Sequence, residues 1–314
     1  MTTILLFGAN GQVGWELARA LAPLGNVLAV GRDRCDFACP ADIGPLVEAA
    51  RPQIIVNAVG YTAVDRAEVE PGLAMTINAE APAALAAAAR KQGALLVHYS
   101  TDYVFDGGKF GPYVENDAPN PLSAYGRSKL AGDQAIQASG CDHLIFRTSW
   151  VYASRGANFL RTMLRLAAER ETLRIVDDQC GAPTSAQLIA STTALVLQQN
   201  IAMRSLHAFE SALLNLTAAG AASWHRFAVN IIDAARERDM PVKCREVVPI
   251  TTAEYLLPAQ RPANSRLSCA NLEVRYGLQM PAWESGLHRV MDEIGGGVPP
   301  QPVRAGGALS AAAA

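Results

Sequence analysis

Short apolar runs alternate with amphipathic segments through the first half of the chain. The apolar runs are rich in Val, Ile, Leu and Phe, and they occupy residues 4–7, 27–30, 54–56, 95–98 and 144–146. Helical periodicity fills the intervals, at residues 13–21, 46–50, 81–91 and 124–139. Strands and helices in this order predict an α/β fold with a doubly wound parallel sheet of the Rossmann type. Such a sheet binds ligands at the carboxyl ends of its strands.

The pattern loosens after residue 150. Helical segments are predicted at residues 159–169, 186–198 and 224–237, with short strands near 174–176 and 246–250. We therefore predict a nucleotide-binding domain at 1–150, to which later segments return, and a mainly substrate-binding lobe at 151–294. Gly, Pro and Ala dominate residues 295–314, which predicts a disordered tail.

Composition excludes several classes of protein. Of the 314 residues, 50% are hydrophobic and 18% are charged, which is typical of a globular protein. With 27 Lys+Arg against 29 Asp+Glu and no long basic run, we expect no nucleic-acid partner. No secretion signal and no unbroken apolar span are evident, and the six cysteines lack Cys-x-x-Cys spacing. We expect a cytoplasmic protein without membrane attachment.

Gly8, Gly11 and Gly14 follow the first predicted strand and lead into a helix. Glycines at this place allow a tight turn and close approach of a pyrophosphate, which the first N–H groups of the helix can bind. The placement favours a dinucleotide site over a purely structural turn.

The second predicted strand ends at Gly31, Arg32 and Asp33. An acidic side chain here binds a ribose diol, whereas an arginine can neutralise a 2′-phosphate. Because Arg32 comes first, NADPH is favoured. The alternatives are NADH as the coenzyme and Arg32 as an ordinary solvated cation. Asp36 and Phe37 could contact the adenine or form a plain turn.

Tyr125 and Lys129 stand four residues apart at the start of a predicted helix and therefore share one face. An ammonium and an oxidised nicotinamide would favour the phenolate, so Tyr125 could exchange a proton with a substrate oxygen. Ser100 and Thr101 end the fourth strand, where their hydroxyls could bind a carbonyl or merely cap a turn. Three such features at strand ends predict an oxidoreductase.

These motifs resemble the extended short-chain dehydrogenase/reductase family and, within it, the dTDP-4-dehydrorhamnose reductases. The resemblance covers nearly the whole chain through blocks at 8–16, 57–65, 100–107, 120–132, 146–152, 178–184 and 261–267. It implies NAD(P)H-dependent reduction of the 4-keto group of dTDP-4-dehydro-β-L-rhamnose to dTDP-L-rhamnose. That product serves bacterial surface polysaccharide, including the O-antigen of lipopolysaccharide.

The resemblance also implies roles for single residues. It assigns Tyr125 and Lys129 to the catalytic pair and Thr101 to the hydroxyl that completes it. The implied cofactor contacts are Gly8, Gly11, Gln12, Val13, Arg32, Asp36, Phe37, Ala58, Val59 and Gly60. The implied substrate contacts are Thr101, Asp102, Trp150, Arg261, Asn264, Ser265 and Arg266. Trp150 could equally be a core residue, and the two arginines suit a diphosphate.

One position departs from the family. In some members three glutamates from two subunits hold Mg²⁺, and here Glu16 and Glu293 match two of them while Gln187 stands at the third. An amide supplies less charge for a hard dication, so we predict no metal-bridged dimer. Mg²⁺ binding, and a monomer as against a homodimer, stay open.

Two other functions compete with this interpretation. A related sugar-nucleotide dehydratase or epimerase resembles the chain at Thr101 and Asp102, but it carries a further acid where this chain has Tyr103. The regulatory subunit of methionine adenosyltransferase resembles the family and is a binding module, not a catalyst. Turnover of NADPH with a dTDP-4-keto sugar separates an enzyme from that module.

Overall fold

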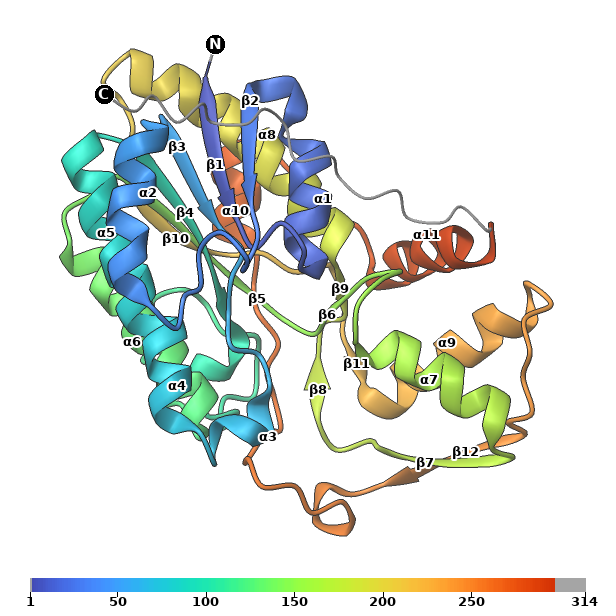
Figure 1. Cartoon of the computed structure of the whole chain (residues 1–314). Coiled ribbons are helices and arrows are strands. Elements are labelled where there is room, and N and C mark those ends of the chain that lie inside the picture. Colours follow the sequence, from blue (N-terminus) through green and yellow to red (C-terminus); the bar gives the residue numbers. More distant parts are fainter. Residues whose placement is uncertain (1, 297–314) are drawn as a thin grey trace.

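The computed structural model describes residues 2–296, whose centre is a six-stranded parallel sheet (Figure 1). The strands are β1 (Thr3–Phe7), β2 (Asn26–Val30), β3 (Ile54–Asn57), β4 (Leu95–Thr101), β5 (His143–Thr148) and β10 (Ala212–Asn215). Their order is β10-β5-β4-β3-β1-β2, and every neighbouring pair is parallel. The predicted α/β fold with a doubly wound sheet is confirmed.

Helices cover both faces of this sheet. One face carries α1 (Gln12–Ala20), α8 (Ala186–Ser205) and α10 (Ala270–Tyr276); the other carries α2 (Ile43–Ala50), α5 (Ala81–Gln92) and α6 (Ala124–Ala138). In β1, Ile4 and Leu6 pack toward the first layer, and Leu5 and Phe7 toward the second. Burial on both faces explains why the strands read as continuous apolar runs.

A second lobe lies beside the sheet, at the lower right of Figure 1. Its helices are α7 (Phe159–Glu169), α9 (Trp224–Arg236) and α11 (Trp283–Gly295), which pack around Phe227 and Trp283. Three two-stranded sheets join them: β6 (Val151–Tyr152) with β9 (Thr184–Ser185), β7 (Thr172–Val176) with β12 (Glu246–Ile250), and β8 (Cys180–Gly181) with β11 (Ala222–Ser223).

Several elements differ from the prediction. The helix predicted at 186–198 continues to Ser205. This helix, α8, and strand β10 are later segments that pack on the central sheet. Three short pieces were missed after β3, namely α3 (Val64–Ala67), α4 (Pro71–Met75) and a π-helical turn at Thr76–Glu80. Each is too short to show helical periodicity.

The predicted tail 295–314 falls almost wholly outside the described residues, which end at Gly296. Its first residue, Gly295, is the last residue of α11. Among residues 2–296, no helix has the length and apolar character needed to cross a membrane.

Candidate active site

The glycine loop joins β1 to α1 and is packed against the loop after β3. Gly8 has φ +80°, and a Cβ there would lie 2.8 Å from the Ala58 backbone. A Cβ on Gly14 would lie 2.0 Å from the carbonyl oxygen of Gly8. Glycine is therefore needed at both positions for the loop to pack.

The amino end of α1 opens into a cavity. Its N-cap is Gly11, which has no side chain to occupy the first N–H groups of the helix. Those donors carry the positive end of the helix dipole and remain available to an anion. Gly11, Gln12 and Val13 line a cavity of about 550 Å³.

A second cavity of about 480 Å³ adjoins the first and shares the residues Ala58, Val59 and Gly60 with it. Gly8, Arg32, Asp36 and Phe37 line this second cavity. Arg32 is exposed and its Nε lies 3.5 Å from Oδ1 of Asp36. Phe37 is buried and packs edge-on against Phe7, with ring centroids 5.4 Å apart. The elongated double cavity runs along the carboxyl ends of β1, β2 and β3.

Tyr125, Lys129 and Thr101 line the first cavity together. Ser123 caps α6 by accepting a hydrogen bond from the Gly126 N–H at 3.1 Å, which places Tyr125 in the first turn of the helix. Burial raises the pKa of Tyr125 to about 12, although a hydrogen bond with Thr101 opposes this shift. The phenol is therefore protonated at neutral pH and is a potential proton donor.

Lys129 lies one turn after Tyr125 in α6 and is buried. Its Nζ donates to the carbonyl oxygen of Tyr99 at 2.6 Å and lies 3.2 Å from Nε2 of His98. Burial lowers the pKa of Lys129 to about 8, against the opposing charge of Asp133. In this structure the Lys129 amine is therefore held by hydrogen-bond partners in β4.

Asp102 is buried at the floor of the cavity. Its carboxylate accepts hydrogen bonds from Thr101 Oγ1 at 3.0 Å and from Ser149 Oγ at 2.8 Å. Burial raises its pKa to about 6, and these hydrogen bonds oppose the rise. A proton on this carboxyl group is therefore accessible near neutral pH.

An aromatic pair forms the opposite wall. Trp150 and Trp224 stack with ring centroids 3.5 Å apart. Trp150 adopts a left-handed backbone, φ 45°, which is rare for a bulky residue. A Cβ on Gly181 would lie 2.5 Å from the Trp150 ring, so a glycine there is required by the stack. Trp150 therefore faces the cavity rather than the core.

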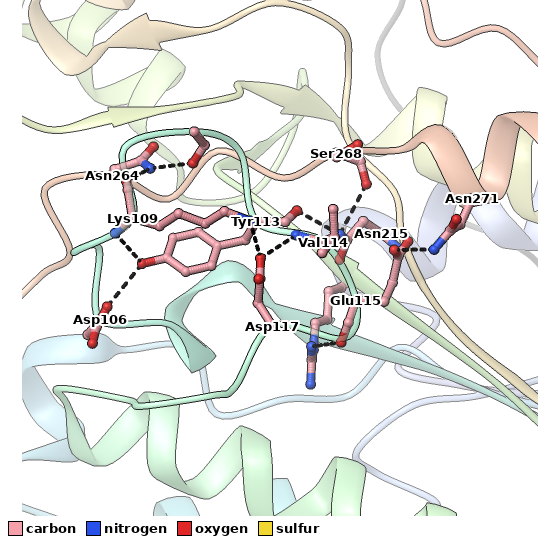
Figure 2. A network of polar contacts seen from close by, with 12 residues as sticks. Asp106, Lys109, Tyr113, Val114, Glu115, Asp117, Asn215, Asn264, Ser268 and Asn271 are labelled. Carbon is pink, nitrogen blue, oxygen red and sulfur yellow. Dashed lines mark hydrogen bonds and ion pairs between the residues drawn. The ribbon is translucent and has the colours of Figure 1, made fainter.

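The carboxy-terminal residues assigned to the substrate hold other parts of the chain. Arg261 makes a two-point ion pair with Asp65, at 3.0 and 2.7 Å. Asn264 donates to the carbonyl oxygens of Lys109 and Gly111, and Figure 2 shows it beside the Lys109 segment. Arg266 is held by Asn264 Oδ1 at 2.8 Å and by the Phe110 carbonyl.

Figure 2 also shows how this segment is anchored more widely. Asn215 at the end of β10 donates to the carbonyl oxygens of Tyr113 and Ser268, and Asn271 donates to Glu115. These contacts join the loop after β4 to the carboxy-terminal segment. Ser265 Oγ has a weak contact, 3.4 Å, with the carbonyl of Cys180.

The three positions linked to Mg²⁺ lie on α1, α8 and α11. Gln187 donates a hydrogen bond from Nε2 to Glu293 Oε1. Burial raises the pKa of Glu16, and the negative charge of Glu293 adds to the rise. Within residues 2–296, no group of three His, Cys, Asp or Glu side chains suits a metal ion.

Some residues of the site gave no sequence signal. Trp224 opens α9 and reaches Trp150 only in the folded chain. Asn158 caps α7 and also donates to Gln12 Oε1 at 2.8 Å, which ties the second lobe to the glycine loop. Asn57 and His98 are fully buried polar residues within strands. For Asn57 and His98, the sequence offers one hint, because each is an isolated polar residue in an apolar run.

Comparison with known proteins identifies the family of this chain. The family model described as RmlD substrate binding domain matches residues 1–295. A dTDP-4-dehydrorhamnose reductase of Burkholderia thailandensis is 51% identical over 282 residues, which cover 89% of this chain and 95% of the relative.

Solved structures give the same result. A dTDP-4-dehydrorhamnose reductase of Clostridium acetobutylicum superposes with a TM-score of 0.84 at 34% identity, covering 93% of this chain and 99% of that one. The enzyme of Bacillus anthracis, solved in complex with NADP, has a TM-score of 0.83 at 34% identity, covering 93% and 100%.

Proposed function

This chain belongs to the RmlD substrate-binding-domain family, that of the dTDP-4-dehydrorhamnose reductases, and we propose how its own residues carry out the reaction. It is an oxidoreductase that reduces the 4-keto group of dTDP-4-dehydro-β-L-rhamnose to dTDP-L-rhamnose. The observation that carries the proposal for its residues is that Tyr125, Thr101 and Lys129 line one cavity with the glycine loop.

The two adjoining cavities fit a nicotinamide nucleotide. The uncapped N–H groups at Gly11 suit a pyrophosphate, and no Cβ at Gly8 or Gly14 blocks the loop. Gly11, Gln12 and Val13 then hold the pyrophosphate, while Ala58, Val59 and Gly60 line the path between the two halves. When bound, the cofactor supplies the hydride that adds to the sugar carbon.

Tyr125 supplies the proton. The Thr101 hydroxyl, which donates to Asp102 in the free protein, would turn to donate to the ketone oxygen and orient it toward the phenol, which gives its proton to that oxygen as the alkoxide develops. Lys129 as an ammonium stabilises the phenolate that remains and binds the nicotinamide ribose. The raised pKa of the free phenol keeps its proton in place until substrate arrives.

NADPH is the coenzyme that we propose, with NADH as the weaker alternative. Arg32 lines the adenosine cavity with its guanidinium exposed, and a 2′-phosphate would compete with Asp36 for it. Asp36 and Phe37 would then border the adenine end of this cavity. The bound NADP in the Bacillus anthracis enzyme supports this choice.

For the substrate we propose a site that extends beyond the catalytic cavity. Asp102 and Trp150 lie where the sugar would sit, beside Tyr125. A further cavity of about 870 Å³ begins at Trp224, and Arg174 and Arg261 line it. Its size and cationic groups suit the nucleotide diphosphate. Asn264, Ser265 and Arg266 would then act by holding the chain around this site.

We propose a cytoplasmic enzyme for surface polysaccharide synthesis, as a monomer or a homodimer without bridging Mg²⁺. All six cysteines are free, as expected in a reducing compartment. The amide of Gln187 already donates to Glu293, which leaves less negative charge around Glu16 than three carboxylates would give.

A coupled assay tests the proposal. The purified protein should consume NADPH only when a dTDP-4-keto-6-deoxy-L-sugar is present, with one equivalent of dTDP-rhamnose formed. A dehydratase or epimerase would convert sugar without net NADPH consumption, and a regulatory binding module would bind without turnover. Either result would contradict the reductase.

A further inference from the structure

A chain of hydrogen bonds runs from the loop after β3 to Lys129. The Val59 N–H donates to Asn57 Oδ1 at 3.0 Å, Asn57 Nδ2 lies 3.0 Å from His98 Nδ1, and His98 Nε2 lies 3.2 Å from Lys129 Nζ. Asn57 and His98 are registered opposite each other in β3 and β4, and both are fully buried. Buried polar atoms must find their partners within this chain.

The backbone N–H of Val59 sets the direction of the whole chain. It can only donate, so the Asn57 atom facing it is the carbonyl oxygen and the other is the NH₂ group. His98 Nδ1 must therefore accept from Asn57. A neutral imidazole that accepts at Nδ1 carries its proton on Nε2. Burial lowers the pKa of His98 well below its usual value, which keeps the ring neutral.

The proton on His98 Nε2 consequently points at Lys129. An ammonium has three donors and no acceptor, so it cannot accept this proton, whereas an uncharged amine has a lone pair that can. The amine can also donate to the Tyr99 carbonyl oxygen at 2.6 Å. Burial lowers the pKa of Lys129 in the same sense.

The other charged groups near Lys129 do not reverse this preference. Asp133, one turn along α6, favours the ammonium, but its carboxylate is shared with Ser100 at 2.8 Å and Arg147 at 3.4 Å. Asp102 is hydrogen-bonded to Ser149, and the Tyr125 phenol is protonated at neutral pH.

We propose that the Val59–Asn57–His98 chain favours the uncharged amine of Lys129 in the cofactor-free protein, so that at pH 9 NADPH binding converts this amine to the ammonium. The proton comes from solvent, and the ammonium finds acceptors in the ribose hydroxyls. This rests on the proposed function, which places the ribose at Lys129. Asn57 and His98 are positioning residues, because they act through the lysine.

Calorimetry of NADPH binding without substrate measures the coupling. It is run in the Tyr125→Phe protein, which removes the competing phenol, at pH 9 in two buffers of different ionisation enthalpy. We expect uptake of close to one proton at pH 9 and almost none at pH 6.5. Affinity should fall about tenfold per pH unit above the pKa of the free lysine.

Binding without proton uptake at pH 9 would overturn the inference. An absence of NADPH binding at pH 7 would instead count against the proposed function, so the two failures are distinguishable. The imidazole ¹⁵N spectrum of the unmodified protein gives a second measurement. It should show His98 as the neutral Nε2–H tautomer from pH 6.5 to 9, and an Nδ1–H tautomer or an imidazolium would also overturn the inference.

Asn57→Asp reverses the direction of the hydrogen bonds between residue 57, His98 and Lys129, and it leaves the shape of the side chain at residue 57 almost unchanged. Both carboxylate oxygens accept, so His98 must donate from Nδ1 and its Nε2 becomes an acceptor for the ammonium. We expect the tautomer to switch and the proton uptake at pH 9 to disappear. Retention of the Nε2–H tautomer would contradict the assigned direction.

Asn78→Asp is the matched control. Asn78 is equally buried and contacts Tyr61 and Ser128, with no hydrogen bond to His98. It adds the same charge without reversing the chain, so proton uptake should persist. Loss of uptake in both variants would show that added charge alone acts, and the directional argument would fail.

Discussion

The strand ends of the central sheet and the segment 261–266 use their functional side chains differently. Thr101 at the end of β4 and Tyr125 in the first turn of α6, beside it, are positioned by short local contacts and line the cavity. In the segment 261–266, Asn264 and Arg266 are hydrogen-bonded to distant parts of the chain, and Arg261 is paired with Asp65 although it also lines the 870 Å³ cavity. The strand ends therefore supply the reactive side chains, while the segment 261–266 mainly holds the surrounding chain in place.

Tyr125→Phe tests the first half of this comparison and should have the largest effect. Removal of the proton donor should lower kcat by about 10² to 10⁴-fold with NADPH affinity nearly unchanged. Tyr103→Phe is the control, because Tyr103 packs against Tyr125 with ring centroids 6.0 Å apart. Steady-state rates and fluorescence titration measure both; near-normal turnover of Tyr125→Phe would refute its role.

Arg32→Ala tests a second side chain that lines a cavity at a strand end. If Arg32 binds the 2′-phosphate, NADPH should bind more weakly by about 1.5 to 3 kcal/mol while NADH is little affected. Arg34→Ala removes a nearby exposed cation outside the cavity lining and should change neither. Equal losses for both coenzymes in Arg32→Ala would mean that Arg32 is a surface cation only.

Asp65→Asn tests the role of the segment 261–266. It removes the charged partner of Arg261, which is only 16% exposed, and should lower the free energy of unfolding by about 1 to 3 kcal/mol. If Arg261 acts by holding the chain, KM for the sugar should rise similarly in Asp65→Asn and Arg261→Gln. A large KM effect confined to Arg261→Gln would show direct binding of the substrate instead.

Gln187→Glu should have the smallest effect and concerns neither region directly. In the unmodified protein, EDTA should leave the rate and the sedimentation coefficient unchanged, because Gln187 donates to Glu293 and offers no negative charge. Gln187→Glu should create a Mg²⁺-dependent shift toward dimer. Dissociation or inactivation of the unmodified protein by chelation would show that its metal site is functional.

Local patterns were sufficient to predict most of the fold. The five early strands lie where their apolar runs predict them, because helices cover both faces of the central sheet, and β12 lies at its predicted position. Strand β10 was missed, since four residues ending in Asn215 carry too little periodicity. The Trp150–Trp224 stack and the His98 chain were missed because they depend on contacts between strands and lobes, which no short window contains.

The position of β10 also constrains synthesis of the protein on the ribosome. Strand β5 ends at Thr148, but its outer neighbour β10 is complete only at Asn215, after residues 149–211 have been translated. Throughout that interval the nascent sheet has an unpaired edge at β5, and until Ser205 has been translated it also lacks the apolar cover of α8. A chain released before Ser205 would expose both surfaces, and chaperone capture is expected for such truncated products. Neither lobe can be produced alone from one continuous stretch of the gene.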